Sequence, residues 1–390
     1  MFFNNMQLPK VFLFCAWCGV ALAAPHIPGS DGDVLERLPG RRDDPVQAEL
    51  RSLRAASNAA PEDSAAAATL ARRYFDLANA EGDPRYVGYA EAALRRWPSN
   101  DAPVEVLYVR GLLRQYRHDF DTALGEFERV LSREPDHFGA RSWRAGLYMV
   151  RADYASAARE CAALPVEKDD LYAVACRAYI DATTGKTAAA YRQLAGALAA
   201  DRDVEPGERL WVLTRLGEMA WRLGDAAAAD RHFRDALALG RDDNFLLAAY
   251  ADFLLEQGRA KEAARLLRDW ARSDTLLLRL AMAEKQLGSP DAQPHIQALG
   301  ERFAAASLRG ERLHMGEEAR YLLDLKGDPA AALAVGLENW KEQREPRDAL
   351  VVLEAAAAAR DAKAAAPVLK WLEQSGFESE RMRRAAASLR

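Results

Sequence analysis

A spacing pattern recurs through the middle of this chain and limits the folds that it can adopt. Five times, a small residue is followed twelve positions later by an alanine, and four positions after that by a hydrophobic residue. The five sets are Gly111/Ala123/Phe127, Ala145/Ala157/Cys161, Ala178/Ala190/Leu194, Gly217/Ala229/Phe233 and Ala251/Ala263/Leu267. Their central alanines are 34, 33, 39 and 34 residues apart. A period near 34 residues, with small side chains where two helices would cross, predicts an all-α solenoid of stacked antiparallel helix pairs.

The recurring small residues have a steric explanation. Two antiparallel helices approach closely only where glycine or alanine removes side-chain bulk, so that Phe127 or Phe233 can fill the adjoining hole. Gly185, Gly224 and Gly258 each stand seven residues after the small crossing residue of their set. Glycine at that point predicts the turn between the two helices, because the turn needs backbone freedom that a Cβ atom would penalise.

Residues 104–136 carry the clearest copy of the repeat. Five of its residues match the tetratricopeptide pattern, namely Leu107, Gly111, Ala123, Phe127 and Pro135. Arg110 and Arg114 stand where that pattern has leucine and tyrosine. The chain resembles tetratricopeptide-repeat proteins, most clearly over residues 104–272, and its residues 70–97 resemble the opening of uncharacterised secreted bacterial repeat proteins. This resemblance implies a right-handed superhelical solenoid that binds rather than catalyses.

The first 24 residues have the pattern of a signal peptide. Lys10 precedes the apolar run Val11–Leu22, and the small residues around Ala23 offer a cleavage site. Beyond this leader, no segment reaches about 18 continuous non-polar residues, so we expect no membrane span after cleavage. The expected location is therefore secreted, in the periplasm of a Gram-negative bacterium.

Two further segments are expected after the leader. Residues 25–62 are rich in Pro, Gly, Asp and Arg, which predicts a flexible N-terminal linker with at most a short helix around residues 47–56. Residues 63–390 form the predicted solenoid. Its outer pairs are expected to begin near residues 64, 274, 313 and 347.

Only two cysteines, Cys161 and Cys176, follow the predicted leader. They fall on the second helix of one predicted pair and on the first helix of the next, which should pack together. In an oxidising compartment such a pair can form a disulfide. The alternative is two small buried hydrophobic residues. Both interpretations stay open, because a sequence does not show whether the two Cβ vectors meet.

Composition and motifs argue against several function classes. The formal net charge is −5, which leaves no basic surplus to neutralise phosphates, so nucleic acid is not an expected partner. None of the six histidines has another histidine or a cysteine three or four residues away, so no metal site is predicted. No nucleophile elbow, zinc-protease helix or dinucleotide loop is present. We therefore expect no cofactor and no enzymatic activity.

In tetratricopeptide proteins the first helix of each pair lines a concave groove. By this resemblance, the expected partner-binding residues are aromatic side chains with one arginine among them, namely Tyr108, Tyr116, Tyr172, Tyr179, Trp211, Trp221, Phe245 and Arg222. Aromatic rings give binding area at low entropic cost. The alternative is that several of these rings only pack between helices.

These observations predict a non-enzymatic scaffold of the cell envelope that holds a protein or an extended peptide in its groove. Two alternatives stay open. One is a scaffold for polysaccharide export, and the other is an envelope hydrolase whose buried acid pair is not visible in the sequence.

Overall fold

The computed structural model describes residues 44–167, 170–201, 203–311 and 313–389. The predicted signal peptide at 1–24 and the expected linker up to residue 43 lie outside the described residues. The chain divides into two units, Met1–Ala48 and Glu49–Arg390. The described part of the first unit is the short stretch 44–48, and all contacts given below belong to the second unit.

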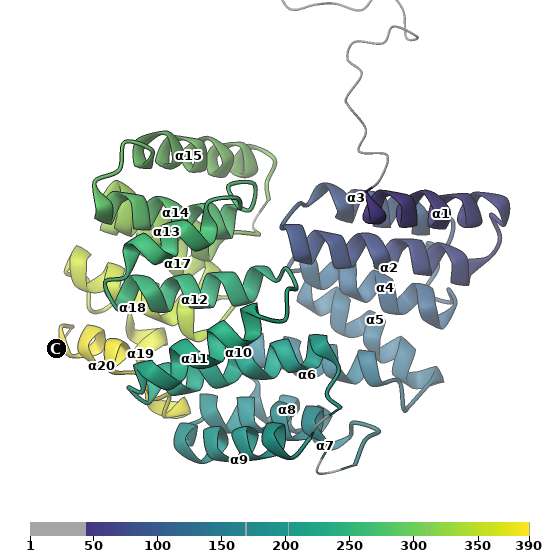
Figure 1. Ribbon diagram of the computed structural model, residues 1–390, viewed down its shortest axis with the longest axis horizontal. Helices are drawn as coiled ribbons and strands as arrows, with labels where there is room; N and C mark the ends of the chain where they lie inside the picture. Colours follow the sequence, from purple (N-terminus) through teal and green to yellow (C-terminus); the bar gives the residue numbers. More distant parts are fainter. Residues whose placement is uncertain (1–43, 168–169, 202, 312, 390) are drawn as a thin grey trace, which may run out of the picture. The chain divides into compact units, whose positions relative to one another are not determined.

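The described residues form α-helices and one short π-helix, with no strand among them (Figure 1). The first ten helices are α1 (Pro45–Ala59), α2 (Ser64–Glu81), α3 (Arg85–Leu94), α4 (Val104–Tyr116), α5 (Phe120–Arg133), α6 (Phe138–Val150), α7 (Tyr154–Ala162), α8 (Leu171–Thr183), α9 (Thr187–Ala200) and α10 (Pro206–Arg222). The others are α11 (Ala226–Leu237), α12 (Asn244–Glu256), α13 (Ala260–Leu267), α14 (Asp274–Leu287), α15 (Ala292–Leu308), α16 (Met315–Arg320), η1 (Tyr321–Lys326), α17 (Pro329–Trp340), α18 (Pro346–Ala359), α19 (Ala366–Ser375) and α20 (Glu380–Ala387).

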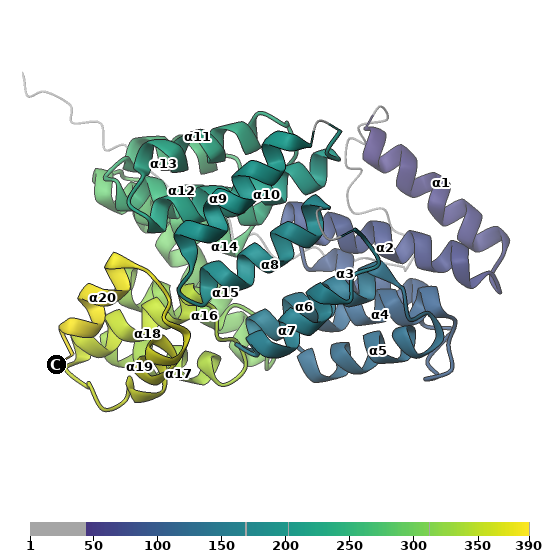
Figure 2. The ribbon, with the colours of Figure 1, turned by 90° about the horizontal axis from the view of Figure 1, so that it is seen from below.

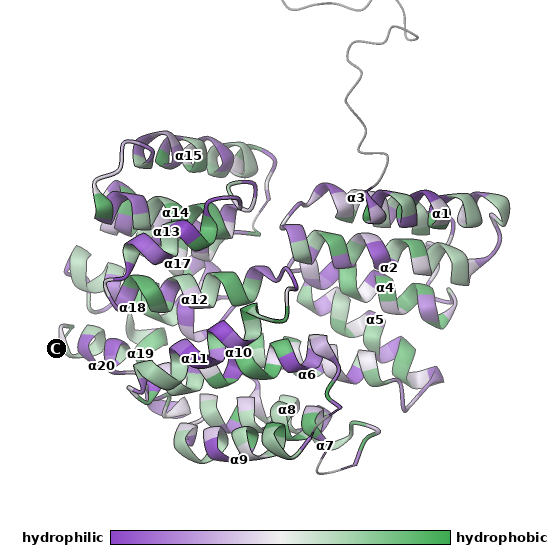
Figure 3. Ribbon diagram, in the orientation of Figure 1, coloured by the Kyte–Doolittle hydropathy of each residue, from purple (hydrophilic) through white to green (hydrophobic). Residues whose placement is uncertain are grey.

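From α2 onward the helices form consecutive pairs, and the predicted solenoid is confirmed. Within the pairs α2/α3, α4/α5, α6/α7, α8/α9 and α10/α11 the two helices pack along each other, and the second helix of each of these pairs also contacts the following pair. The later pairs begin with α14, α16 and α18, close to the predicted positions 274, 313 and 347. Hydrophobic and hydrophilic residues alternate along the helices (Figure 3), as expected of helices that bury one face.

The predicted crossings depend on the absence of side-chain bulk. A Cβ atom built on Gly111 would lie 2.5 Å from the ring of Phe127, and one built on Gly217 would lie 2.7 Å from the ring of Phe233. Both rings are fully buried. A larger residue at either glycine would therefore force the helices apart.

The turn inside each of the five predicted repeats contains one residue in the left-handed region. The predicted turn glycines are confirmed, since Gly185, Gly224 and Gly258 have φ values of +82°, +81° and +69°. In the other two repeats the same position holds His118 and Ala152, both at φ +58°. The turn conformation is thus common to all five repeats, whether or not a glycine is present.

The helix α1 changes the expected N-terminal boundary of the solenoid. Leu50 is fully buried, Glu49 forms a 2.8 Å ion pair with Arg73, and Arg54 Nε donates to the Tyr74 hydroxyl at 2.6 Å. Residues 49–59 therefore pack on α2, whereas the sequence predicted a flexible linker over 25–62 with at most a short helix. The difference arises because tertiary packing orders a segment whose composition is typical of a linker.

The C-terminal helices contact helices from the middle of the chain. Arg344 N donates to Val150 O at 2.7 Å, and Trp371 Nε1 donates to the Tyr154 hydroxyl at 2.9 Å. Glu378 accepts a 2.8 Å bond from Thr187 N at the start of α9. Figure 2 shows α18, α19 and α20 gathered together. Among the described residues, no helix combines the length and the apolar character that a membrane span requires.

Candidate binding cavity

First helices of consecutive pairs line a partly open cavity of about 470 Å³, called the central cavity below. Its walls come from α8, α10, α12, α14, α16 and α18, together with residues 377–384 at and before α20. Four of the predicted groove residues lie on these walls, namely Tyr179, Trp221, Arg222 and Phe245. The cavity therefore collects part of the predicted aromatic set at one place.

Arg215 lies between two of these rings. Its guanidinium carbon is 4.3 Å from the ring centroid of Tyr179 and 4.3 Å from that of Phe245. Nη1 of the same side chain forms a 2.8 Å ion pair with Glu218, one turn further along α10. A guanidinium between two aromatic faces is held by cation–π attraction, so α8, α10 and α12 are joined here by one side chain.

Arg222 forms a second contact between an arginine and an aromatic ring on the cavity wall. Its guanidinium carbon is 4.4 Å from the ring centroid of Phe377, and Nη2 donates to Ala182 O at 2.6 Å and to Thr187 Oγ1 at 2.7 Å. Burial lowers the pKa of this guanidinium to about 10, so it stays charged at neutral pH. Since these partners are neutral, Arg222 brings positive charge to this wall.

An acidic cluster lies at the α16 and α18 side. Arg347 forms a 2.7 Å ion pair with Glu345. Burial would raise the pKa of Glu317, but the positive charges led by Arg347 lower it to about 2. Burial raises the pKa of Asp348 well above its usual range, although Arg347 opposes this shift.

Asp348 serves the local fold of α18. Its Oδ1 accepts from Asn339 Nδ2 at 3.0 Å and its Oδ2 accepts from Glu345 N at 3.2 Å, the latter as part of a capping box. The side chain is buried, so both carboxyl oxygens are used inside the protein. Although two acids with divergent pKa values can be an acid–base pair in an enzyme, Asp348 is occupied as a helix cap.

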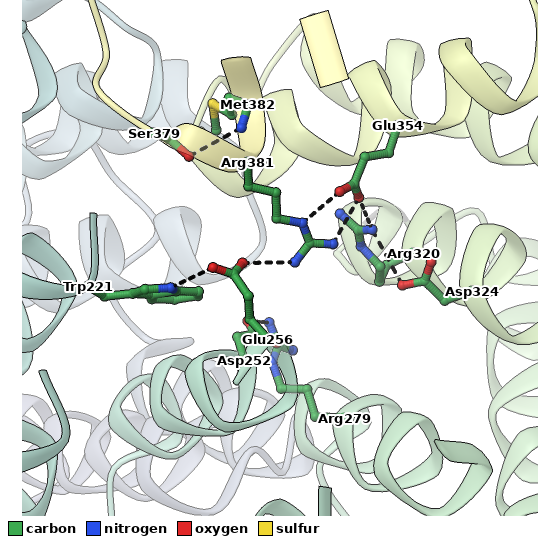
Figure 4. Close-up of polar contacts among 10 residues, drawn as sticks. All are labelled: Trp221, Asp252, Glu256, Arg279, Arg320, Asp324, Glu354, Ser379, Arg381 and Met382. Carbon is green, nitrogen blue, oxygen red and sulfur yellow. Dashed lines mark hydrogen bonds and ion pairs between the residues drawn. The ribbon is translucent and has the colours of Figure 1, made fainter. Parts of the chain in front are cut away.

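A line of ion pairs borders the central cavity on its α20 side (Figure 4). Arg381 on α20 contacts Glu354 on α18 through Nε at 2.6 Å and Nη2 at 3.1 Å, and it contacts Glu256 on α12 at 3.4 Å. Trp221 Nε1 donates to the other oxygen of Glu256 at 2.8 Å. Arg320 also pairs with Glu354. Burial would raise the pKa of Glu354, but these two arginines lower it.

The other predicted groove residues lie away from the central cavity. Tyr172 stacks on Trp211 with ring centroids 5.1 Å apart, Tyr108 packs 4.7 Å from the His137 ring, and Tyr116 packs 6.5 Å from Phe75. These rings fill spaces between helices, which was the alternative interpretation of the stripe. Trp211 and Trp221 share α10, but ten residues of helix separate them by roughly 15 Å, so they reach different surroundings.

Arg222 is the charged wall residue among the predicted groove set, whereas Arg215, Glu256 and Arg381 were not predicted. A positional signal was nevertheless present. Tyr179, Glu218 and Asp252 each directly follow the small crossing residue of their repeat, and all three line the central cavity. Arg222 and Glu256 stand four residues further on and line it too. The position relative to the crossing residue, rather than aromatic character, marks the inner face.

Cys161 on α7 and Cys176 on α8 form a disulfide, with Cα atoms 5.8 Å apart. The bond joins two consecutive pairs, at the contact where the repeat register placed the two residues. No group of three or more His, Cys, Asp and Glu side chains in the described part of the chain has the arrangement of a metal site.

The comparisons with known proteins give the following similarities. No protein-family model matches the chain, and no curated protein matches it. A tetratricopeptide repeat protein from Parabacteroides merdae is 15% identical, over 61% of this chain and 92% of that chain, with a TM-score of 0.44. The human IFIT1 dimer with PPP-AAAA is 16% identical, over 88% of this chain and 86% of that chain, with a TM-score of 0.43. At such scores the function has to be inferred from this chain's own residues.

Proposed function

We propose that this chain is a non-enzymatic scaffold that holds a segment of another protein, or an extended peptide, in the central cavity. The observation that carries the proposal is the composition of the walls, where Tyr179, Trp221 and Phe245 alternate with arginines and carboxylates. Rings can bury apolar side chains of a ligand, while charged groups pair with its backbone or its charges. The volume of about 470 Å³ is typical of a ligand site.

The polar groups of the cavity support binding rather than catalysis. Arg279 is paired with Asp252 at 2.7 Å, and Arg215 is paired with Glu218. These two carboxylates are thus already occupied as partners of arginines on the same walls. A hydrolase would therefore need a residue other than these, and polysaccharide export stays an alternative that the experiment below distinguishes.

We also propose that this scaffold works in the cell envelope. The predicted signal peptide and the disulfide between Cys161 and Cys176 support this location, because disulfides persist in oxidising compartments. N-terminal sequencing of the protein from its native cells tests the proposal. A mature N-terminus near residue 24 is expected, and recovery of an intact Met1 terminus from the cytoplasm would contradict it.

The test of cavity binding is a Tyr179→Ala, Trp221→Ala double variant used as bait in the native cell envelope. Loss of true anchor rings costs about 2 kcal/mol or more, near thirtyfold in affinity. The matched control is Tyr89→Ala, since Tyr89 is an exposed ring on α3 outside the cavity. The double variant should lose the partner and the control should keep it, with unchanged helix content in both.

Three other outcomes would contradict the proposal. If the double variant retrieves the partner as well as the wild type does, the partner binds to another surface. Co-purification of a polymer in place of a protein would favour the polysaccharide alternative. Activity of the purified chain on cell-wall material would favour a hydrolase.

A further inference from the structure

The helix α20 carries an arginine that lies between two neighbouring hollows. Arg381 lines the central cavity and also an adjacent hollow of about 1090 Å³. Both spaces share Glu256, Met282, Arg381 and Arg384 in their walls. Side chains of α20 thus lie between the central cavity and the adjacent hollow. If α20 moved away, the two hollows would join into a longer groove.

The carboxylates that hold Arg381 are fixed by other partners. Glu256 accepts from Trp221 Nε1 at 2.8 Å, and Glu354 is paired with Arg320. The two acids come from α12 and α18, and neither depends on α20 for its position (Figure 4). If Arg381 left, its site would remain in place as a pair of oriented carboxylates.

The charge around that site would then favour a cation. Outside α20, the charged side chains around this site are three acids and two basic residues, namely Glu256, Asp324 and Glu354 with Lys285 and Arg320. Lys285 is already bound to the carbonyl oxygens of Asp324 and Leu325 at 2.6 and 3.2 Å. Removal of α20 takes away both Glu380 and Arg384, so the three acids and two basic side chains that remain leave a surplus of negative charge.

The helix α20 is a short element with a small buried face. It has eight residues, of which only Met382 and Ala386 are buried. An isolated helix of this length is not stable in water, so its position depends on its contacts with the rest of the protein. These are the apolar contacts of Met382, Ala385 and Ala386 and the ion pairs of Arg381. Such an anchor is small compared with the buried faces of the paired helices.

We propose that α20 is an internal ligand of the binding groove, and that the partner contributes a basic segment whose arginine or lysine replaces Arg381 between Glu256 and Glu354. This inference rests on the proposed function, since it places the partner at the central cavity. It adds the chemistry of the partner: a positive side chain followed by an apolar one, in the order of Arg381 and Met382. When the partner binds, its basic segment takes the place of α20, and α20 is released.

The experiment uses the full chain and a fluorescent synthetic peptide with the sequence of residues 377–389, added in trans. Wild-type protein binds this peptide weakly, because its own α20 occupies the site. Arg381→Ala weakens the internal competitor, so the peptide should bind at least about tenfold more tightly, measured by fluorescence anisotropy. The same peptide with its arginine at position 381 replaced by alanine should lose this gain.

Two protein variants complete the experiment. The matched control is Arg383→Ala, because Arg383 is exposed on α20 and pairs only with Glu380 among the ion pairs found. It should bind the peptide as the wild type does. Adding Glu354→Gln to Arg381→Ala should abolish the gain, because the oriented carboxylate is lost. Helix content by circular dichroism should stay unchanged throughout.

If Arg381→Ala binds the peptide no more tightly than wild type and Arg383→Ala do, α20 is only a packed helix of the solenoid and not an internal ligand. Equal gains for the arginine and alanine peptides would also overturn the inference, since basic recognition would be absent. Neither result affects the proposed function, because partner retrieval by the Tyr179→Ala, Trp221→Ala variant is measured separately. Conversely, the double variant could still retrieve the partner while the peptide exchange behaves as predicted. That outcome would reject the proposed partner site and keep α20 as an internal ligand.

Discussion

The helix pairs from α2 to α7 and those from α8 onward follow the same construction but use their inner faces differently. In the earlier pairs, Tyr108 and Tyr116 pack against neighbouring rings between helices. In the later pairs Tyr172 and Trp211 also stack between helices, but Tyr179 and Trp221 line the central cavity. The difference shows that a repeat determines its own pairing, whereas the use of its inner face depends on which distant helices lie opposite.

The largest expected effect tests whether the two regions really share one construction. Phe127→Ala and Phe233→Ala each remove a fully buried ring at a helix crossing, one in each region. Each should lower the free energy of unfolding by about 3–5 kcal/mol, because the cavity left behind is enclosed. Urea unfolding followed by circular dichroism measures both. A loss below about 1 kcal/mol in one region alone would show that its crossings are built differently.

The second prediction compares a shielded ion-pair site of the later region with an exposed ion pair of the earlier region. Glu354→Ala leaves Arg320 and Arg381 without their shared carboxylate, and should cost about 1–3 kcal/mol because the site is largely shielded from water. Glu91→Ala breaks the more exposed pair with Arg117 and should cost about 0.5 kcal/mol. Thermal unfolding of both variants gives the comparison. Equal losses would mean that the ion pairs at α20 are no more than surface pairs.

A third, smaller effect is a pH dependence in the later region. The pKa of Glu317 is about 2, below its ordinary value, so its ionised form stabilises the fold above the unfolded pKa near 4.5. That contribution is lost as pH falls through this range toward 2. Glu317→Gln should therefore be less stable than wild type at pH 7, and the gap should narrow at pH 3.5. A gap that is independent of pH would show that the charge of Glu317 is not involved.

The smallest expected effect compares one turn position in the two regions. Ala152 and Gly224 stand at equivalent turns with φ of +58° and +81°. Gly224→Ala should cost about 1 kcal/mol, because a Cβ atom there meets no neighbour but strains the backbone. Ala152→Gly should gain up to about 0.5 kcal/mol, since relief of strain outweighs the lost methyl contact. The melting temperatures of both variants, compared with that of the wild type, test this prediction. A lower melting temperature for Ala152→Gly would mean that the methyl contact of Ala152 outweighs the backbone strain.

Much of the fold was predictable, while only part of the cavity was. The crossings at Gly111 and Gly217 and the turns at Gly185, Gly224 and Gly258 are as expected, because each involves residues within one repeat. Of the eight predicted groove residues, Tyr179, Trp221, Arg222 and Phe245 lie together. The remaining four belong to other contacts, since helix position alone does not tell which inner faces meet.

The sequence by itself determined the helix pairs, their turns and their small-residue crossings, because these depend on contacts between residues about 12 to 39 positions apart. Only the tertiary structure decided where α1 and α20 pack and which side chains share the central cavity. Glu256 meets Arg381 across 125 residues, and Tyr154 meets Trp371 across 217. Such long-range contacts depend on the small rotation between each helix pair and the next, which accumulates along the solenoid. No local sequence pattern predicts the total rotation.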